Sequence, residues 1–209
     1  GLTAPEAAPL DDADGMRVLE RCDRLLLPRA RTAHKGKLGR VVLWAGSRGM
    51  AGAASMTARA ALHSGAGLVS IHSAARCETI LQTALPEAIF EADDNENHIS
   101  DIQLTRRYNS IAIGPGLGTH TDTREAFIRL LPQLTYPIVV DADALNLMQG
   151  NATTLSLLPR QSIITPHHRE FDRLFGESTT QYERLQKAVE MSRHYQIVIV
   201  LKGAHTAIV

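Results

Sequence analysis

The chain has 209 residues with 22 acidic and 22 basic side chains, and its apolar content of 44% predicts one globular domain, or one domain with a tail. A net charge of zero, a pI of about 7.3 and only 4% aromatic residues argue against a nucleic-acid partner, which favours basic patches and stacking side chains. No run approaches the roughly 18 apolar residues of a membrane span, and no signal peptide opens the chain. The two cysteines, Cys22 and Cys77, are far apart in the sequence, which predicts reduced thiols in a cytoplasmic protein.

The first 27 residues differ in composition from the rest of the chain. Residues 1–15 are rich in Ala, Pro and Asp, which is typical of a linker or an exposed tail. Apolar residues at near-helical spacing predict a short helix over 16–27, ended by Pro28. A small basic cluster follows, for which a solvated face and a phosphate-facing role are both open: Arg29, Arg31, His34 and Lys35. We therefore expect a tail over 1–27 and the domain over 28–209.

Short apolar runs alternate with helical patterns over the remaining chain. Continuous runs rich in Val and Ile are typical of strands buried on both faces, and we expect such strands at 41–45, 68–72, 110–113, 137–141, 161–164 and 197–201. Helices are expected at 53–63, at 121–131 with Thr121 or Asp122 as N-cap, and at 181–195 with Leu185, Val189 and Met191 facing inward. Residues 93–97 read as a polar surface loop. This alternation predicts an α/β domain in three layers around a mainly parallel sheet.

Glycines or titratable groups follow five of the expected strands. Ligands of open α/β sheets bind beyond the carboxyl ends of the strands, so these segments predict a single cleft. The segments are Gly46-Ser47-Arg48-Gly49, Gly114–Gly118, Asp141–Asn146, Thr165–Glu170 and Lys202–Thr206. The last is expected to form a turn into a returning strand over 206–209.

Two glycine segments are candidates for phosphate binding. The first, Gly46–Gly52, lies between a strand and a helix, where backbone N–H groups favour anions. It lacks the Gly-Lys-Ser/Thr ending of a P-loop. The second, Gly114–Gly118, reads GxGxG rather than GxGxxG, so a tight turn is an alternative. Because Asp141 then ends the next strand, a Rossmann dehydrogenase is a rival interpretation.

The polar candidates each have a structural alternative. Asp141 and Asp143 could hold Mg²⁺ or a ribose, or Asp143 could cap a helix beginning at Ala144. His167 is fixed by the preceding proline and lies at a strand end, and Glu170 could cap the next helix or reach the cleft. Lys202 could contact a phosphate. No pattern of His or Cys residues predicts a structural metal.

Seven motifs in one order carry a resemblance that no single motif does: HKGKLGRVVLWAGSRGMAGA, SGAGLV, LPEA, IGPGLG, DADALN, TPHHREF and LKGAHT. From about Leu27 to its end, the chain resembles the ADP-dependent NAD(P)H-hydrate dehydratases, the carboxy-terminal module of YjeF-type proteins. The resemblance implies a ribokinase-like fold. It also implies a metabolite-repair reaction, in which hydrated NADH or NADPH is dehydrated at the expense of ADP (ATP in eukaryotic relatives), with Mg²⁺ as an expected cofactor.

The resemblance also implies site residues. Ala53, Gly118 and His167 fall on the positions that bind the hydrated dinucleotide, and Gly116, Asp143 and Asn146 are our additions to that cleft. The adenine nucleotide is expected at Lys202, Gly203, Ala204, His205 and Thr206. The Gly46–Gly52 loop then becomes a wall for the substrate rather than the nucleotide cradle.

The family pattern continues beyond this sequence. A GxGD segment, which supplies an anion hole and an aspartate base, would lie past Val209, so we expect binding with little turnover from these residues alone. A small-molecule kinase on the same fold and a nucleotide-binding module without turnover are the alternatives. Relatives suggest a homo-oligomer and an upstream epimerase domain.

Overall fold

The computed structural model describes residues 31–32, 34–104, 106–150 and 152–209. The expected helix over 16–27 and Cys22 lie outside these residues, and a domain boundary at residue 28 stays a prediction. Residues 34–209 form a compact unit of their own. None of the described helices is both long enough and apolar enough to cross a membrane.

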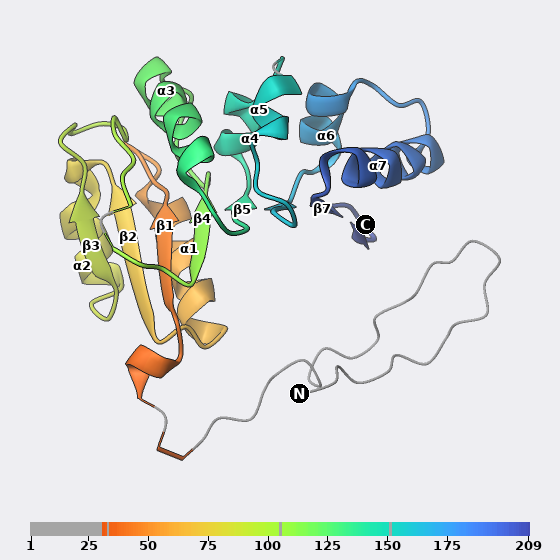
Figure 1. Cartoon of the computed structure of the whole chain (residues 1–209). Helices are drawn as coiled ribbons and strands as arrows, with labels where there is room; N and C mark the ends of the chain where they lie inside the picture. The colour runs from red at the N-terminus through yellow and green to blue at the C-terminus, as the bar shows by residue number, and fades with distance from the viewer. Residues whose placement is uncertain (1–30, 33, 105, 151) are drawn as a thin grey trace. The chain divides into compact units, whose positions relative to one another are not determined.

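The unit is built around an eight-stranded sheet in the order β3-β2-β1-β4-β5-β6-β7-β8 (Figure 1). All neighbouring strands are parallel except β7 and β8, which form an antiparallel pair at one edge. The strands are β1 (Arg40–Trp44), β2 (Leu68–Ser73), β3 (Ile89–Ala92), β4 (Ser110–Ile113), β5 (Val139–Val140), β6 (Ile163–Ile164), β7 (Val198–Leu201) and β8 (Ala207–Ile208). The prediction of a mainly parallel sheet is confirmed.

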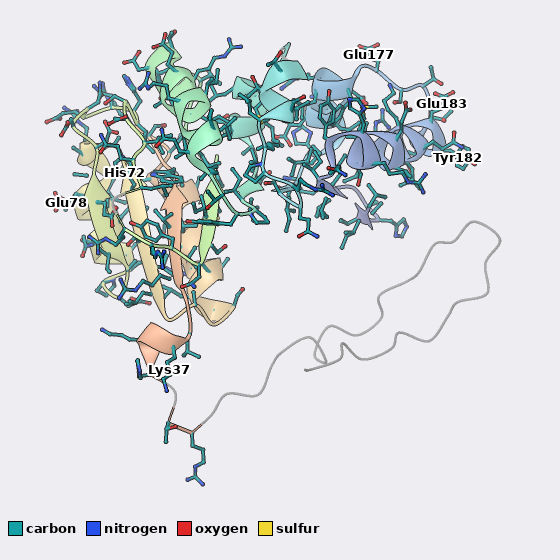
Figure 2. All side chains as sticks on the ribbon, in the orientation of Figure 1. Lys37, His72, Glu78, Glu177, Tyr182 and Glu183 are labelled. Atoms are coloured by element: carbon teal, nitrogen blue, oxygen red, sulfur yellow. The ribbon has the colours of Figure 1, made fainter. Side chains whose placement is uncertain are left out.

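Helices and short 3-10 turns connect the strands. The helices are α1 (Ala51–His63), α2 (Glu78–Ala84), α3 (Thr121–Leu130), α4 (Asp143–Leu147), α5 (Ala152–Ser156), α6 (His168–Phe175) and α7 (Gln181–Tyr195). The 3-10 turns are η2 (Lys35–Lys37), η3 (Ala75–Cys77) and η4 (Leu131–Gln133). In Figure 2 Tyr182 and Glu183 project outward from α7, whereas His72 lies among the strand ends.

The two faces of the sheet bury separate hydrophobic cores. Successive side chains of a strand point to opposite faces, and β1 shows this directly. Val42 and Trp44 belong to the larger core, with side chains of α3, α4 and α6, while Leu43 and Ala45 belong to the smaller core, with α1 and α2. The sheet is therefore covered on both sides, and the predicted three-layer α/β architecture is confirmed.

Three local predictions need correction. Neither Thr121 nor Asp122 caps α3; its N-cap is His120, and no side chain accepts a capping hydrogen bond there, because the Asp122 carboxylate pairs with His98 Nε2 at 3.0 Å. In α7 the buried residue is Ala188; of the three residues expected to face inward, Met191 packs against the larger core as predicted, while Leu185 and Val189 are only partly buried. Residues 93–97 do not lie wholly on the surface, because the Asp93 side chain is only 1% exposed.

Candidate functional site

The two glycine segments lie against each other at the carboxyl edge of the sheet. Gly46 N–H donates to Pro115 O at 2.9 Å, and Ser47 Oγ donates to Gly116 O at 2.8 Å. Gly116 has a φ of +66°, and a Cβ added there would lie 2.9 Å from Ala53 Cβ. Only glycine fits this approach. The structure therefore brings together Ala53 and Gly116, which the sequence placed in one cleft.

Gly118, Asp143 and Asn146 form a second group of predicted site residues in contact. Gly118 N–H donates to Asp143 Oδ2 at 2.9 Å, and Asn146 Nδ2 donates to Asp143 Oδ1 at 3.3 Å. The alternative in which Asp143 caps a helix beginning at Ala144 is wrong, because α4 begins at Asp143 and makes no side-chain cap bond. The carboxylate instead ties the second glycine segment to α4, as a cleft residue would.

Asp141 and Lys202 join the ends of β5 and β7 across the intervening strand β6. Lys202 Nζ lies 2.7 Å from Asp141 Oδ1, and their side chains are 40% and 31% exposed. Such a half-open pair is screened by water and contributes little to stability. It leaves an ammonium group at the strand ends, within reach of a ligand. The sequence predicted a ligand role for Lys202 but did not predict its pairing with Asp141.

A strained residue separates the two aspartates. Ala142 has φ +49° and ψ −121°, a conformation that non-glycine residues rarely adopt. Its N–H donates to Asp141 Oδ1 at 2.8 Å. Strain of this kind costs about 1–3 kcal/mol and tends to occur at functional sites. Here the strained turn directs Asp141 toward Lys202 and Asp143 toward Gly118.

His167 is the N-cap of α6. Its Nδ1 accepts hydrogen bonds from the N–H groups of Arg169 and Glu170 at 3.1 and 3.3 Å, and Glu170 Oε2 accepts from His167 N–H at 2.9 Å. This reciprocal capping box confirms the structural alternative for Glu170. Because Nδ1 accepts, Nε2 is the ring nitrogen that can donate, and it lies 3.4 Å from Glu170 Oε1 in the first turn of α6. His167 also pairs with Lys202 through a parallel β-bridge, so it lies beside the Lys202 segment.

The segment from Gly203 to Thr206 is an exposed turn between β7 and β8, as predicted. A Cβ at Gly203 would lie 2.8 Å from His168 Nε2, so the His168 ring packs against this turn. Exposed backbone N–H groups next to Lys202 suit a phosphate or a nucleotide. The predicted residues thus fall into two neighbouring groups, one around Ala53, Gly116, Gly118 and Asp143, and one around His167 and Lys202.

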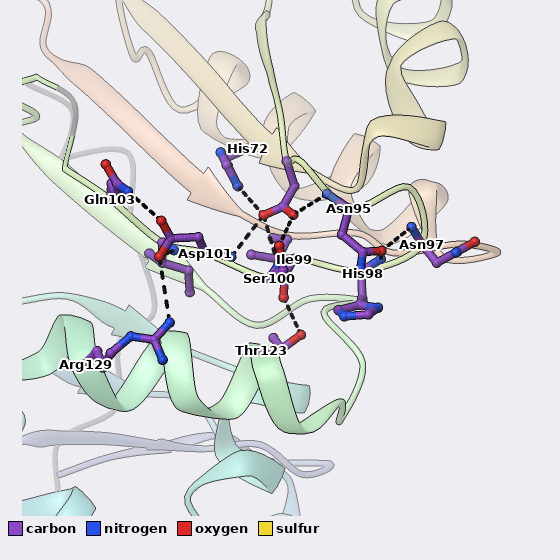
Figure 3. A network of polar contacts seen from close by, with 12 residues as sticks. His72, Asn95, Asn97, His98, Ile99, Ser100, Asp101, Gln103, Thr123 and Arg129 are labelled. Carbon is purple, nitrogen blue, oxygen red and sulfur yellow. Dashed lines mark hydrogen bonds and ion pairs between the residues drawn. The ribbon is translucent and has the colours of Figure 1, made fainter.

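The sequence reading missed a buried network beside the first group (Figure 3). Asp93 follows β3 directly and accepts hydrogen bonds from His72 Nε2 at 3.0 Å, from Ser100 Oγ at 2.7 Å, and from backbone N–H groups of Asn95, Ser100 and Asp101. Burial would raise the pKa of this carboxyl, but these hydrogen bonds hold the pKa well below its ordinary value. The only signal in the sequence was a histidine within an apolar strand.

Comparisons with known proteins identify the family of the chain. A family model described as NAD(P)H-hydrate dehydratase matches residues 41–209, which include every predicted site residue. The chain belongs to the NAD(P)H-hydrate dehydratase family. It is 35% identical over 197 residues to the bifunctional NAD(P)H-hydrate repair enzyme Nnr of Moorella thermoacetica, with 90% of this chain and 37% of that protein covered.

Relatives from Bacillus subtilis match in both sequence and structure. The chain is 35% identical to the ADP-dependent (S)-NAD(P)H-hydrate dehydratase of that organism over 88% of its own length and 66% of the relative's. A crystal structure of the ADP/ATP-dependent NAD(P)H-hydrate dehydratase from B. subtilis, co-crystallised with ATP/Mg²⁺, superposes with a TM-score of 0.74 at 33% identity, covering 88% of this chain and 64% of that one. The chain therefore spans between about a third and two thirds of these relatives.

A third neighbour supports the fold assignment. A ribokinase-like superfamily protein from Enterococcus faecalis superposes with a TM-score of 0.69 at 26% identity, covering 87% of this chain and 63% of that one. The expectation of a ribokinase-like fold is thus confirmed for this member of the dehydratase family. The rival Rossmann dehydrogenase interpretation is wrong, because Asp141 pairs with Lys202 and the whole matched region follows the dehydratase pattern.

Metal ligands are sparse in this family member. Among the described residues, no group of three or more His, Cys, Asp or Glu side chains could hold a metal ion. Mg²⁺ commonly keeps several waters and binds through one or two carboxylates together with substrate phosphates. Asp141 and Asp143 fit that mode, in which a nucleotide supplies most of the oxygen ligands.

Proposed function

We propose that this protein dehydrates hydrated NADH and NADPH back to the intact cofactors, with ADP as phosphoryl donor. The observation that supports this most strongly is the family match over 41–209, a range that contains both groups of predicted site residues. Relatives named for the same reaction align over most of this chain. The proposal extends their printed activity to this protein.

The proposed reaction makes a poor leaving group into a good one. The terminal phosphoryl group of ADP passes to the hydroxyl oxygen of the hydrated nicotinamide ring, leaving AMP. The C–O bond then breaks with release of inorganic phosphate, and a proton lost from the adjacent carbon restores the ring double bond. Hydroxide would leave far more slowly, so the nucleotide is consumed in each turnover.

The geometry supports a division of the cleft into two subsites. The hydrated dinucleotide would lie along Ala53, Gly116 and Gly118, where positive-φ glycines leave room for close approach of the ligand. The adenine nucleotide would lie at Lys202–Thr206. Lys202 would exchange its half-exposed contact with Asp141 for a phosphate, a charge-assisted contact of the same kind. Asp143, Asn146 and His167 would line the boundary between the two subsites.

Mg²⁺ is part of the proposed reaction because the B. subtilis relative was co-crystallised with ATP/Mg²⁺. Asp141 or Asp143 would help to hold the ion, which would supply positive charge to neutralise the transferred phosphoryl group. The protein's own residues would orient that group. Lys202 would hold the phosphates, and the strained turn at Ala142 would keep both carboxylates at the cleft.

A repair assay tests the proposal. The protein from the complete reading frame is incubated with hydrated NADH, ADP and Mg²⁺, and the recovery of NADH absorbance is followed. Recovery with release of AMP and phosphate supports the dehydratase. The small-molecule kinase would instead leave a stable phosphorylated product without recovery, and a binding module would leave both reactants unchanged.

A substitution at Ala53 tests the division into subsites. Ala53→Leu should weaken NADPH binding by roughly tenfold, because overpacking against Gly116 costs about 1–3 kcal/mol, while ADP binding stays within about twofold. Ala60→Leu makes the same change on the exposed face of α1 and serves as control. A larger loss of affinity for ADP than for NADPH would indicate instead that the glycine loop binds the adenine nucleotide.

Assembly and location complete the proposal. We propose a cytoplasmic homo-oligomer that acts with an NAD(P)H-hydrate epimerase activity, supplied in cis or by a second protein. The support is the bifunctional naming of several relatives and the buried free thiol of Cys77, which suits a reducing compartment. Light scattering of the purified protein would test the oligomer.

A further inference from the structure

A pocket beside the Gly46–Gly52 loop has no role in the two subsites described so far. It has a volume of about 270 Å³ and lies between the start of α1 and the start of α2. Its lining residues are Arg48, Gly49, Ala51, Gly52, Arg76, Cys77 and Ile80. Sites for whole drug-sized ligands measure about 300–1,000 Å³, so this pocket suits one part of a larger ligand.

Two arginines from different loops give the pocket its chemistry. Arg48 follows β1 and Arg76 follows β2, so the two guanidinium groups reach the same space from neighbouring strand ends. In the part of the chain that the structure describes, the Arg48 side chain makes no hydrogen bond or ion pair. Guanidinium groups match phosphate oxygens in charge and in hydrogen-bond geometry.

The backbone of both arginines is attached to the loop that begins at Asp93. Arg48 N–H donates to Asn97 O at 2.8 Å, and Arg76 N–H donates to Glu96 O at 3.3 Å. Both arginines are thus attached to a single loop, the one that Asp93 folds through its hydrogen bonds in Figure 3. A fixed backbone at both arginines leaves fewer conformations to be lost when a ligand binds.

The surroundings of the pocket leave room for a ligand. A Cβ placed on Gly49 or Gly52 would meet no atom within 4 Å, so the backbone there is open to the pocket. Ile80, which is 57% exposed, offers an apolar wall. One opposing charge is present, because Glu96 Oε2 lies 3.2 Å from Arg76 Nη2 at the rim. Glu96 would therefore compete with an anion for Arg76.

We propose that this pocket binds a phosphate group of the hydrated dinucleotide, held between Arg48 and Arg76. Gly52 lines the pocket, and the next residue, Ala53, faces Gly116 in the dinucleotide subsite. The Cα atoms of Gly52 and Ala53 are only about 3.8 Å apart, so a dinucleotide in contact with Ala53 could extend a phosphate into the pocket. The inference rests on the proposed function and extends it. It assigns to the glycine loop a second surface, which binds the negative charge of the substrate.

Direct binding measurements test this pocket. The complete protein is titrated calorimetrically with NADPH and with NADH, with and without Arg48→Gln and Arg76→Gln. We expect Arg48→Gln to weaken NADPH binding by roughly tenfold and the double variant by more, with ADP binding unchanged. Glu96→Gln should strengthen NADPH binding by about two- to threefold, because it releases Arg76.

The control is Arg59→Gln, which removes the same charge from an exposed position of α1 that does not line the pocket. It should leave NADPH affinity within about twofold of the wild type. A loss confined to NADPH would assign the pocket to the ribose 2′-phosphate, and an equal loss for NADPH and NADH would assign it to the pyrophosphate. Both outcomes support the proposal, and melting temperatures confirm that each variant folds.

Three results would overturn it. These are unchanged affinity in the double variant, an equal loss in Arg59→Gln, and no binding of either dinucleotide by the wild type. Failure of the proposed function is a separate result. It would appear as no recovery of NADH in the repair assay while the arginine-dependent binding of NADPH persists.

Discussion

Asp93 and Asp141 occupy equivalent places in the sheet but have opposite roles. Each follows the last residue of a parallel strand, β3 and β5 respectively. The Asp93 side chain is 1% exposed and accepts hydrogen bonds from side chains and backbone. The Asp141 side chain is 31% exposed, and among the described residues its contacts are with Lys202 and the next backbone N–H.

The difference shows that one edge of the sheet carries both a structural carboxylate and a carboxylate open to solvent. A buried carboxylate surrounded by donors fixes the loop that it begins, and that loop holds Arg48 and Arg76. The half-exposed carboxylate of Asp141 holds a partner that is itself 40% exposed, which would leave Lys202 available to a ligand. An aspartate at a strand end therefore does not by itself indicate a site, because its exposure and its donors decide its role.

The largest expected effect comes from removing the buried carboxylate. Asp93→Ala leaves His72, Ser100 and several N–H groups without their acceptor, and should lower the free energy of unfolding by about 3 kcal/mol. Urea denaturation measures this change. Asp94→Ala, on the exposed neighbour, should change stability by less than about 0.5 kcal/mol. Similar values for both variants would contradict a supporting role for Asp93.

The pH dependence of stability in acid should show the contribution of the same carboxylate, Asp93. The pKa of Asp93 is lowered in the folded protein, so its contribution to stability is present above the ordinary carboxyl pKa and is lost as pH falls toward the folded value. Between about pH 5 and pH 3 the free energy of unfolding should therefore fall more steeply in the wild type than in Asp93→Asn. Asp94→Asn should keep the wild-type slope. Parallel slopes in all three proteins would exclude a depressed pKa.

A smaller effect is expected where the two glycine segments meet. Gly116→Ala combines a positive φ with a Cβ that lies 2.9 Å from Ala53 Cβ, and should lower the free energy of unfolding by about 2 kcal/mol. Gly49→Ala has a similar φ of +86° but open space around its Cβ, so it should cost only about 1 kcal/mol. Thermal denaturation of both variants isolates the close approach. Equal losses would mean that backbone conformation alone requires glycine at residue 116.

The half-exposed pair should affect binding more than stability. Lys202→Ala should weaken ADP binding by roughly tenfold, because one charge-assisted phosphate contact is lost, and change the free energy of unfolding by less than about 1 kcal/mol. Calorimetric titration with ADP measures the first effect. Lys187→Ala, whose ammonium binds the carbonyls of Gly176 and Glu177, is a matched control and should bind ADP normally. A purely structural Lys202 would give the reverse pattern.

Several elements were predictable because local sequence fixes them. The runs at 41–45, 68–72 and 110–113 became β1, β2 and β4, since strands buried on both faces need uninterrupted apolar side chains. The runs at 137–141 and 161–164 formed strands of only two residues, β5 and β6. The short strand β3 was not predicted, because its sequence IFEA is too brief and too polar to give a clear pattern.

The site was predictable in part. The motifs placed Ala53, Gly116, Gly118 and Asp143 at one edge of the sheet, and the structure brings them into contact in pairs. The His167–Glu170 capping box was one of two readings of that spacing. The pairing of Asp141 with Lys202 spans 61 residues, so no local pattern could indicate it.

By itself, the sequence determined the alternation of strands and helices, the edge at which ligands bind, and the family through the order of its motifs. Only the tertiary structure decided which strand-end residues are buried and which remain open. His72 and Asp93 are 21 residues apart in sequence but 3.0 Å apart in space, because β2 and β3 are neighbours in the sheet. Burial and hydrogen bonding depend on such distant neighbours. For this reason the sequence predicted a polar surface loop at 93–97, whereas in the structure this loop supports the glycine loop.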